Sequence, residues 1–245
     1  MDGLTQSISS TTIHDRVSSK IKTIQTISEF EMVSWLAEGL KGEFKTDVFV
    51  REFAAGYGIA DLVFAKSFKY KSNQLDRKPI SNYYALLLYL GLEDEQPFKL
   101  NDARLNTKAS DSTTQAAIAY LLKDGYVQQI EKGVYIKSYA IERLSLKLVA
   151  IEAKLRDWKS GILQARRYKS FTDESYLALL SRYEKNVDYE LLDTHDIGLI
   201  LVDETTGEIT FKRRPIGTRP LHMNAIETSI YADELFLDSY SVKTV

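Results

Sequence analysis

Residues 144–155 read LSLKLVAIEAKL, the strongest strand pattern in the chain. Apolar side chains fall on both faces of this strand, which is typical of a strand buried in the centre of a sheet. Because side chains alternate along a strand, Leu148, Ala150, Glu152 and Lys154 share one face. Two charged residues therefore continue an apolar face, where unpaired charge is costly to bury.

A second strand carries a carboxylate in an equally unfavourable position. Residues 59–65 read IADLVFA and form a predicted hairpin with residues 46–53, around a turn at 54–58. Alternation places Asp61 and Val63 on one face of this strand. Glu152 and Lys154 alone could be an ion pair that reaches solvent at a strand end, and such pairs are common and weak. A carboxylate at Asp61 favours a functional site instead.

Two carboxylates from neighbouring strands beside one lysine make a site for a hard cation. Mg²⁺ prefers oxygen ligands, and one or two carboxylates with water and substrate phosphate usually hold it. Such an ion polarises a phosphodiester and lowers the pKa of a water. Lys154 would orient or deprotonate that water, or neutralise charge developing on the phosphate. The chain has no cysteine, which excludes disulfides and thiolate metal sites.

The pattern resembles the PD-(D/E)XK motif of restriction-endonuclease-like nucleases. Here the motif reads GIAD, ending at Asp61, and IEAK, ending at Lys154, with Ala60 in place of the family's proline. The resemblance implies a metal-dependent deoxyribonuclease, with an endonuclease favoured over an exonuclease. It assigns Mg²⁺, or Mn²⁺ as a substitute, to Asp61, Glu152 and the backbone carbonyl of Ala153.

A second match follows on the next predicted helix. Residues 164–168 read QARRY and look like the QxxxY motif of the RecB-like branch of this superfamily. Gln164 and Tyr168 are four residues apart and so lie on one helix face, and Gly161 would let that face approach the sheet. The resemblance gives Gln164 a catalytic role and Tyr168 a role in substrate binding. The alternative is a helix that carries one polar and one aromatic surface residue.

The first predicted helix begins at Ser28, with Glu31 completing a capping box, and Gly42 is the expected C-cap. Its apolar stripe consists of Phe30, Val33, Leu36 and Leu40. The superfamily often places a glutamate on this helix to complete the metal site. Glu29 is assigned that role because Glu31 caps the helix, and Glu52 is a further candidate.

Residues 79–138 have a different pattern: three helices, at 81–92, 100–107 and 113–123, precede a hairpin that turns at 131–133. This order resembles a winged helix-turn-helix. Inserted between two strands of the main sheet, it accounts for the 91 positions that separate Asp61 from Glu152. Thr113 and Gln115, near the start of the third helix, are candidates for DNA contacts. Protein contacts or dimerisation are an open alternative for this module.

The expected fold is α/β (α+β), a restriction-endonuclease-like core with a central mixed sheet flanked by helices. The expected division is an N-terminal extension (1–27), the nuclease core (28–78 and 139–245) and the inserted winged-helix-like module (79–138). After residue 155 the pattern is helix 158–169, strand 174–180 and a final hairpin from 197 to 211. The strand–helix–strand step requires a parallel, right-handed crossover.

The net charge of −2 is not that of a protein coated with phosphate contacts. Basic residues are nevertheless dense after the Glu-x-Lys strand, and we assign Arg156, Arg166 and Arg167 to substrate binding. DNA is the expected partner, and a homodimer would allow both strands to be cut. The longest apolar run has ten residues, too few to cross a membrane, and no secretory signal is visible, so a cytoplasmic location is expected. The competing interpretation is a non-catalytic DNA-binding or regulatory protein on a nuclease scaffold.

Overall fold

The computed structural model describes residues 27–55, 58–69, 77–217 and 225–243. Of the expected N-terminal extension (1–27), residues 1–26 lie outside the described residues. A six-stranded mixed sheet forms the larger part of the structure, in the order β1-β2-β6-β7-β8-β9. Its strands are β1 (Phe49–Ala54), β2 (Ile59–Lys66), β6 (Lys147–Lys154), β7 (Glu174–Leu180), β8 (Gly198–Val202) and β9 (Ile209–Arg213).

The strand predicted to be central, β6, lies third in the sheet, antiparallel to β2 and parallel to β7. Leu148 to Ala153 are all buried, which agrees with its two apolar faces. The predicted hairpin of β1 and β2 is present, and so is the closing antiparallel pair of β8 and β9. The central mixed sheet flanked by helices is thus confirmed.

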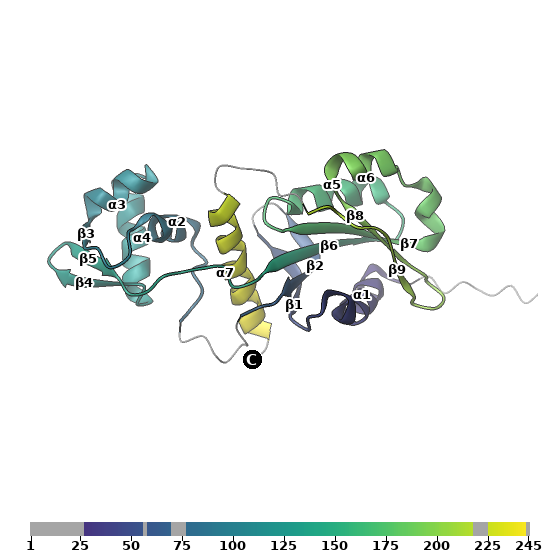
Figure 1. The fold of residues 1–245 in the computed structure, drawn as a ribbon, viewed down its shortest axis with the longest axis horizontal. Coiled ribbons are helices and arrows are strands. Elements are labelled where there is room, and N and C mark those ends of the chain that lie inside the picture. The colour runs from purple at the N-terminus through teal and green to yellow at the C-terminus, as the bar shows by residue number, and fades with distance from the viewer. Residues whose placement is uncertain (1–26, 56–57, 70–76, 218–224, 244–245) are drawn as a thin grey trace, which may run out of the picture.

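Helices cover both faces of the sheet (Figure 1). α1 (Glu29–Phe44) packs on one face, against Leu62, Phe64 and Ile151. α5 (Trp158–Tyr168) and α6 (Tyr189–His195) pack on the other, against alternating leucines of β7 and β8. α5 makes the predicted crossover between parallel β6 and β7, and a short 3-10 helix, η1 (Ser181–Asn186), follows β7.

Two expectations for α1 are wrong. The helix does not end at Gly42 but continues to Phe44, and Lys45 forms the C-cap in the left-handed conformation, with φ 54°. The reason is packing, because the buried Phe44 ring contacts the rings of Phe64 and Tyr176. Phe30 does not belong to the buried stripe, since 73% of its surface is exposed. The predicted capping box is confirmed.

Residues 79–138 form a second, smaller unit with a three-stranded sheet in the order β3-β5-β4. The elements are α2 (Tyr83–Gly91), β3 (Phe98–Lys99), α3 (Leu100–Thr107), α4 (Asp111–Lys123), β4 (Val127–Glu131) and β5 (Val134–Lys137). The two-residue strand β3 was not predicted, because so short a segment has no alternation to detect. Leu86, Tyr89, Ile118 and Leu121 belong to the hydrophobic core of this unit, to which Ile230 near the C-terminus also contributes.

The helix near the C-terminus, α7 (Ala225–Lys243), lies between the inserted module and β1 (Figure 1). Its neighbouring acids Asp233 and Glu234 are fully buried. Glu234 accepts hydrogen bonds from Arg77 and from the Ile80 N–H, where the chain enters the inserted module. Asp233 accepts from Arg143 and the Leu144 N–H, where the chain leaves it. α7 therefore anchors both chain connections between the main sheet and the inserted module. None of the helices in the described part of the chain is both long and apolar enough to span a membrane.

Removing the carboxylate of Glu234 is expected to lower the free energy of unfolding strongly. Glu234→Ala leaves Arg77 partly buried without its partner, a change that typically costs about 3–5 kcal/mol. Asp238→Ala, at an exposed position of α7, is the matched control. Urea unfolding of both variants measures the difference, and equal stabilities would contradict the anchoring role of Glu234.

Gly161 lets α5 approach the sheet, as the sequence predicted. A Cβ at this position would lie 2.5 Å from Leu177 Cδ1 and 3.1 Å from Lys154 Cγ. Leu177 is fully buried, so Gly161→Ala is expected to cost about 1–3 kcal/mol through overpacking.

Gly42→Ala is the control, because a Cβ there meets nothing within 4 Å and the change should stabilise α1 by about 0.5–1 kcal/mol. Thermal unfolding compares the two variants. A Gly161→Ala protein as stable as the wild type would show that the close approach is not required.

Candidate active site

The site begins where β2 and β6 separate. Their antiparallel pairing ends at Leu62 and Ile151, whereas β6 stays paired with β7 as far as Lys154. Beyond this point the Ala153 N–H donates a hydrogen bond to the carboxylate of Asp61, with a distance of 2.7 Å to Oδ2. A side chain thus replaces a strand partner, and the sheet opens between the two strands that carry the predicted site.

Glu152 lies inside this opening, with 2% of its surface exposed. Its Oε1 is 2.6 Å from Lys154 Nζ, and its Oε2 is 2.5 Å from the hydroxyl of Tyr168. The same hydroxyl lies 2.6 Å from the carbonyl oxygen of Ile59. Three elements, β2, β6 and α5, therefore meet at this carboxylate.

Tyr168 does not have the substrate-binding role expected from the sequence. Its side chain is buried and both neighbours of its hydroxyl are protein atoms, so it holds Glu152 in place. The sequence put Gln164 and Tyr168 on one helix face and predicted that Gly161 lets this face approach the sheet, but it did not show that the hydroxyl of Tyr168 meets Glu152. The buried Oε1 of Gln164 has no hydrogen-bond partner, a state that among the described residues it shares with the hydroxyl of Ser138.

Burial raises the pKa of both carboxyl groups. For Asp61, the hydrogen bond from Ala153 and the charge of Lys154 act against burial, while the charges of Glu29 and Glu52 add to it. For Glu152, the hydrogen bonds of Lys154 and Tyr168 oppose burial, and the charge of Asp61 raises the pKa further. The negative charges of the site repel one another, and a cation would relieve that repulsion.

Lys154 responds in the opposite sense to burial. Burial by itself would lower its pKa, but the hydrogen bond to Glu152 and the negative charges of Glu152, Asp61 and Glu29 raise it above its usual value. Lys154 is therefore an ammonium ion at neutral pH, which suits charge neutralisation better than proton abstraction.

A cleft of about 390 Å³ opens beside Asp61. Its lining residues come from α1, β1 and β2, and they are Glu29, Phe30, Val33, Arg51, Glu52 and Asp61. Glu29 and Glu52, both candidates from the sequence, thus lie in the same cleft as Asp61. The strand pairs on either side, Arg51 with Leu62 and Phe53 with Ala60, place Glu52 opposite Asp61. The backbone of Glu52 has a φ of 52°, in the left-handed region that a glutamate seldom adopts.

The other predicted contact residues lie outside this cleft. Arg166 and Arg167 are exposed on α5, and Arg156 is exposed in the connection that precedes it. On α4 of the inserted module, Gln115 is exposed, whereas the hydroxyl of half-buried Thr113 is 2.8 Å from Ser110 Oγ at the helix cap.

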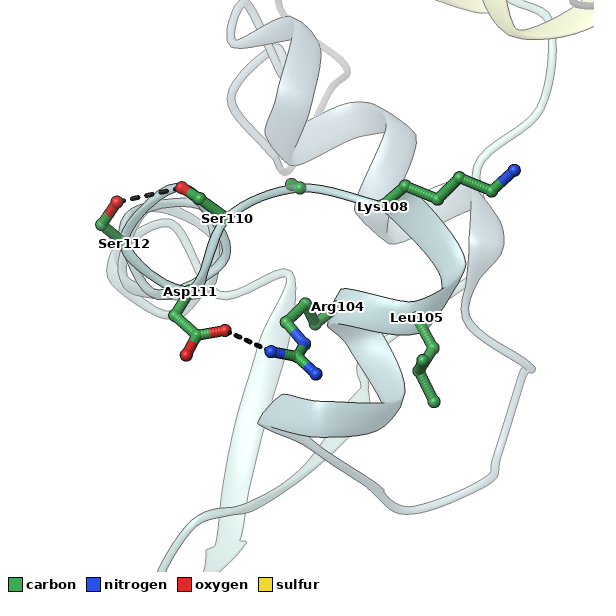
Figure 2. Close-up of a pocket in the computed structure, with 7 residues that line it drawn as sticks. Arg104, Leu105, Lys108, Ser110, Asp111 and Ser112 are labelled. Carbon is green, nitrogen blue, oxygen red and sulfur yellow. Dashed lines mark hydrogen bonds and ion pairs between the residues drawn. The ribbon is translucent and has the colours of Figure 1, made fainter.

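A broad hollow of about 720 Å³ lies at the turn from α3 to α4 (Figure 2). At its edge Arg104 is paired with Asp111 at 2.9 Å. The side chain of Lys108 points away from that pair in Figure 2.

No sequence pattern identified Arg51 as a residue of the cleft, and the helical pattern wrongly placed Phe30 in the buried stripe. The signal for Phe30 was its position in the first turn of α1, where a residue of the apolar stripe can lie beyond the sheet that the stripe covers. No local sequence pattern could identify Arg51, because it reaches the cleft only through the packing of β1 against the start of α1.

Among the described residues, no group of three or more His, Cys, Asp or Glu side chains has an arrangement that could hold a metal ion. No protein-family model matches the chain, and neither a curated protein nor a solved structure shows significant similarity to it. The function must therefore be inferred from the residues themselves.

The raised pKa of Asp61 predicts how stability depends on pH. A carboxyl group whose pKa is raised by folding stabilises the protein at pH values below its ordinary pKa, and this contribution is lost as the pH rises through the folded value. Asp61→Asn keeps an oxygen that can accept from the Ala153 N–H and removes the charge. In the absence of divalent metal, the variant should gain stability relative to wild type as the pH rises above about 4, the ordinary pKa of an aspartate.

Thermal unfolding across this pH range measures the effect, with Asp238→Asn on the exposed side of α7 as the control. A wild-type protein that becomes more stable than Asp61→Asn as the pH rises would refute the raised pKa.

Proposed function

We propose that this chain is a divalent-metal-dependent nuclease of the PD-(D/E)XK superfamily that hydrolyses phosphodiester bonds in DNA. The observation that carries the proposal is the meeting of Asp61, Glu152 and Lys154 where β2 and β6 separate. Asp61 and Glu152 lie 91 positions apart in the chain, yet the fold brings both carboxylates and the lysine to one opening.

The order of elements supports a restriction-endonuclease-like core. The strand with Asp61 lies next to the strand with Glu-x-Lys, and the helix with the QxxxY pattern packs on both through Tyr168. This arrangement fits what the motifs implied. An ion pair at a strand end, the alternative for Glu152 and Lys154, fits less well because Glu152 is buried and contacts α5.

The donor set suits a hard cation such as Mg²⁺. Asp61 and Glu152 are carboxylates, and one or two carboxylates with waters and substrate phosphate suffice for this ion. The N–H and carbonyl of one strand residue face the same neighbouring strand, so the Ala153 carbonyl faces the side of Asp61. Gln164, on the same face of α5 as Tyr168, adds a buried oxygen, Oε1, that has no hydrogen-bond partner.

Each residue then has a role in phosphodiester hydrolysis. A bound divalent ion supplies charge stabilisation on the phosphate and lowers the pKa of a water. Asp61 and Glu152 would hold the ion, and Tyr168 fixes the carboxylate of Glu152. The ammonium of Lys154 stabilises the negative charge that develops on the phosphate in the transition state. Glu29 lines the same cleft and adds its negative charge to that of Asp61.

The inserted module favours DNA as the substrate. Its order of helix, strand, two helices and a hairpin, with a three-stranded sheet, supports our interpretation of the module as a winged helix. We assign it a part in gripping DNA through the start of α4, where Gln115 is exposed. Arg156, Arg166 and Arg167 are assigned contacts with the phosphate backbone.

One observation favours the second candidate, a DNA-binding protein that has kept a nuclease fold without catalysis. Both oxygens of Glu152 and one oxygen of Asp61 already contact donors of the protein. A cation must displace or share these contacts, so metal binding separates the two functions.

A cleavage assay tests the nuclease. Wild-type protein is incubated with circular and linear DNA in Mg²⁺ or Mn²⁺, and cleavage is expected to stop on chelation. Asp61→Ala and Lys154→Ala should each lower the rate by about a hundredfold or more, the usual cost of removing one group that stabilises the transition state.

Asp238→Ala and Lys185→Ala, at exposed positions of α7 and η1, are the matched controls and should cut at the wild-type rate. If wild type leaves duplex DNA, single-stranded DNA and RNA intact and gains no thermal stability from Mg²⁺, the nuclease is refuted. Retained DNA binding would then support the non-catalytic candidate.

A further inference from the structure

An aromatic side chain lies at the mouth of the cleft without a place in the hydrophobic core. Phe30 is 73% exposed, although it stands on α1 only three residues before buried Val33. It lines the same cleft as Asp61. An exposed phenylalanine ring does not contribute the stabilisation that burial would give. The position of Phe30 beside the proposed site therefore suggests a role in binding.

Arg51 lies beside this ring. Its guanidinium carbon is 5.7 Å from the centre of the Phe30 ring, and Nη1 donates a hydrogen bond to the hydroxyl of Ser34, one turn further along α1, at 3.1 Å. The arginine is thus held against α1 with its charge at the cleft. Phe30 and Arg51 together form a pair, one flat apolar face and one cation, in a cleft whose other lining residues are Val33 and the acids Glu29, Glu52 and Asp61.

The chemistry of this pair fits a nucleotide. A base offers an uncharged π-face, which an exposed aromatic ring binds by stacking, and the adjoining phosphate is attracted by arginine. We infer that Phe30 and Arg51 form a nucleotide subsite next to the scissile phosphate, in which Phe30 stacks on an unpaired base and Arg51 contacts the phosphate beside it. The inference rests on the proposed nuclease function.

The base must be unpaired for a physical reason. Bases within a continuous duplex are stacked on both faces, so a side chain at the duplex surface meets only base edges. A ring can stack on a base only in a single strand, or where a nucleotide is unpaired or displaced from the helix, and displacement costs least at unpaired positions. The subsite therefore selects single strands and duplexes with unpaired nucleotides over continuous duplex. Stacking makes no hydrogen bonds to the base, so the preference is for structure rather than sequence.

Binding of oligonucleotides tests the subsite without relying on cleavage. A single strand, a duplex with one unpaired 2-aminopurine and a fully paired duplex are titrated in Ca²⁺ with wild type, Phe30→Ala and Phe30→Trp. Phe30→Ala should weaken binding of the first two by at least about fivefold, the lower end of base–aromatic stacking, and leave the paired duplex unchanged. Phe30→Trp should retain binding and the quenching of 2-aminopurine fluorescence.

Leu146→Ala is the matched control, because Leu146 is 68% exposed and precedes β6, at the opposite end of that strand from Lys154. Phe30→Ala binding that equals wild type, or that falls equally for paired and unpaired DNA, overturns the subsite. Phe30-dependent binding without cleavage in Mg²⁺ supports the subsite and refutes the nuclease. Cleavage that requires Asp61 but shows no effect of Phe30 on any substrate supports the nuclease and refutes the subsite.

Discussion

The hydrogen bond from the Ala153 N–H to Asp61 is the contact on which the site depends. It forms where the ladder between β2 and β6 stops, after Leu62 and Ile151. A backbone donor left without a strand partner is costly to bury, and the carboxylate of Asp61 satisfies it. The same contact holds the opening beside Glu152, so that a charged pair can lie within an otherwise apolar sheet. If β2 and β6 stayed paired for two more residues beyond Leu62 and Ile151, the two strands would fill the space that the proposed reaction needs.

Helix packing on the two faces of the sheet sets the rest of the site. On one face α5 comes close because Gly161 has no side chain to meet Leu177, and this approach brings the hydroxyl of Tyr168 to Glu152. On the other face the start of α1 passes over the sheet end and places Glu29 and Phe30 beside Asp61. Asp61, Glu152 and Lys154 thus lie on strands, whereas these neighbours of the site come from the two helices. A shift of either helix would change the site without touching Asp61 or Lys154.

The inserted module joins the sheet between the two strands of the site, but at their other end. Lys66 at the end of β2 pairs with Lys147 at the start of β6, and at about 3.3 Å per residue this pair lies about 17 Å from Asp61. A substrate that reaches both the module and the cleft must therefore extend along β2 and β6, as a strand of DNA can. The buried acids of α7 hold both connections to the module, so the same helix that packs on β1 fixes the path between the two proposed binding regions.

Much of this protein was determined by its sequence alone. Alternation and composition gave the six strands of the main sheet, the central place of β6 and the faces of Asp61 and Glu152, because these patterns are local. The same holds for the capping box of α1 and for Gly161 as a point of close approach. Only the tertiary structure decided that α1 extends to Phe44, that Tyr168 is buried against Glu152, and that Phe30 and Arg51 meet at the cleft. Each of these depends on which distant surface a residue faces, and such contacts leave no periodic signal in the chain.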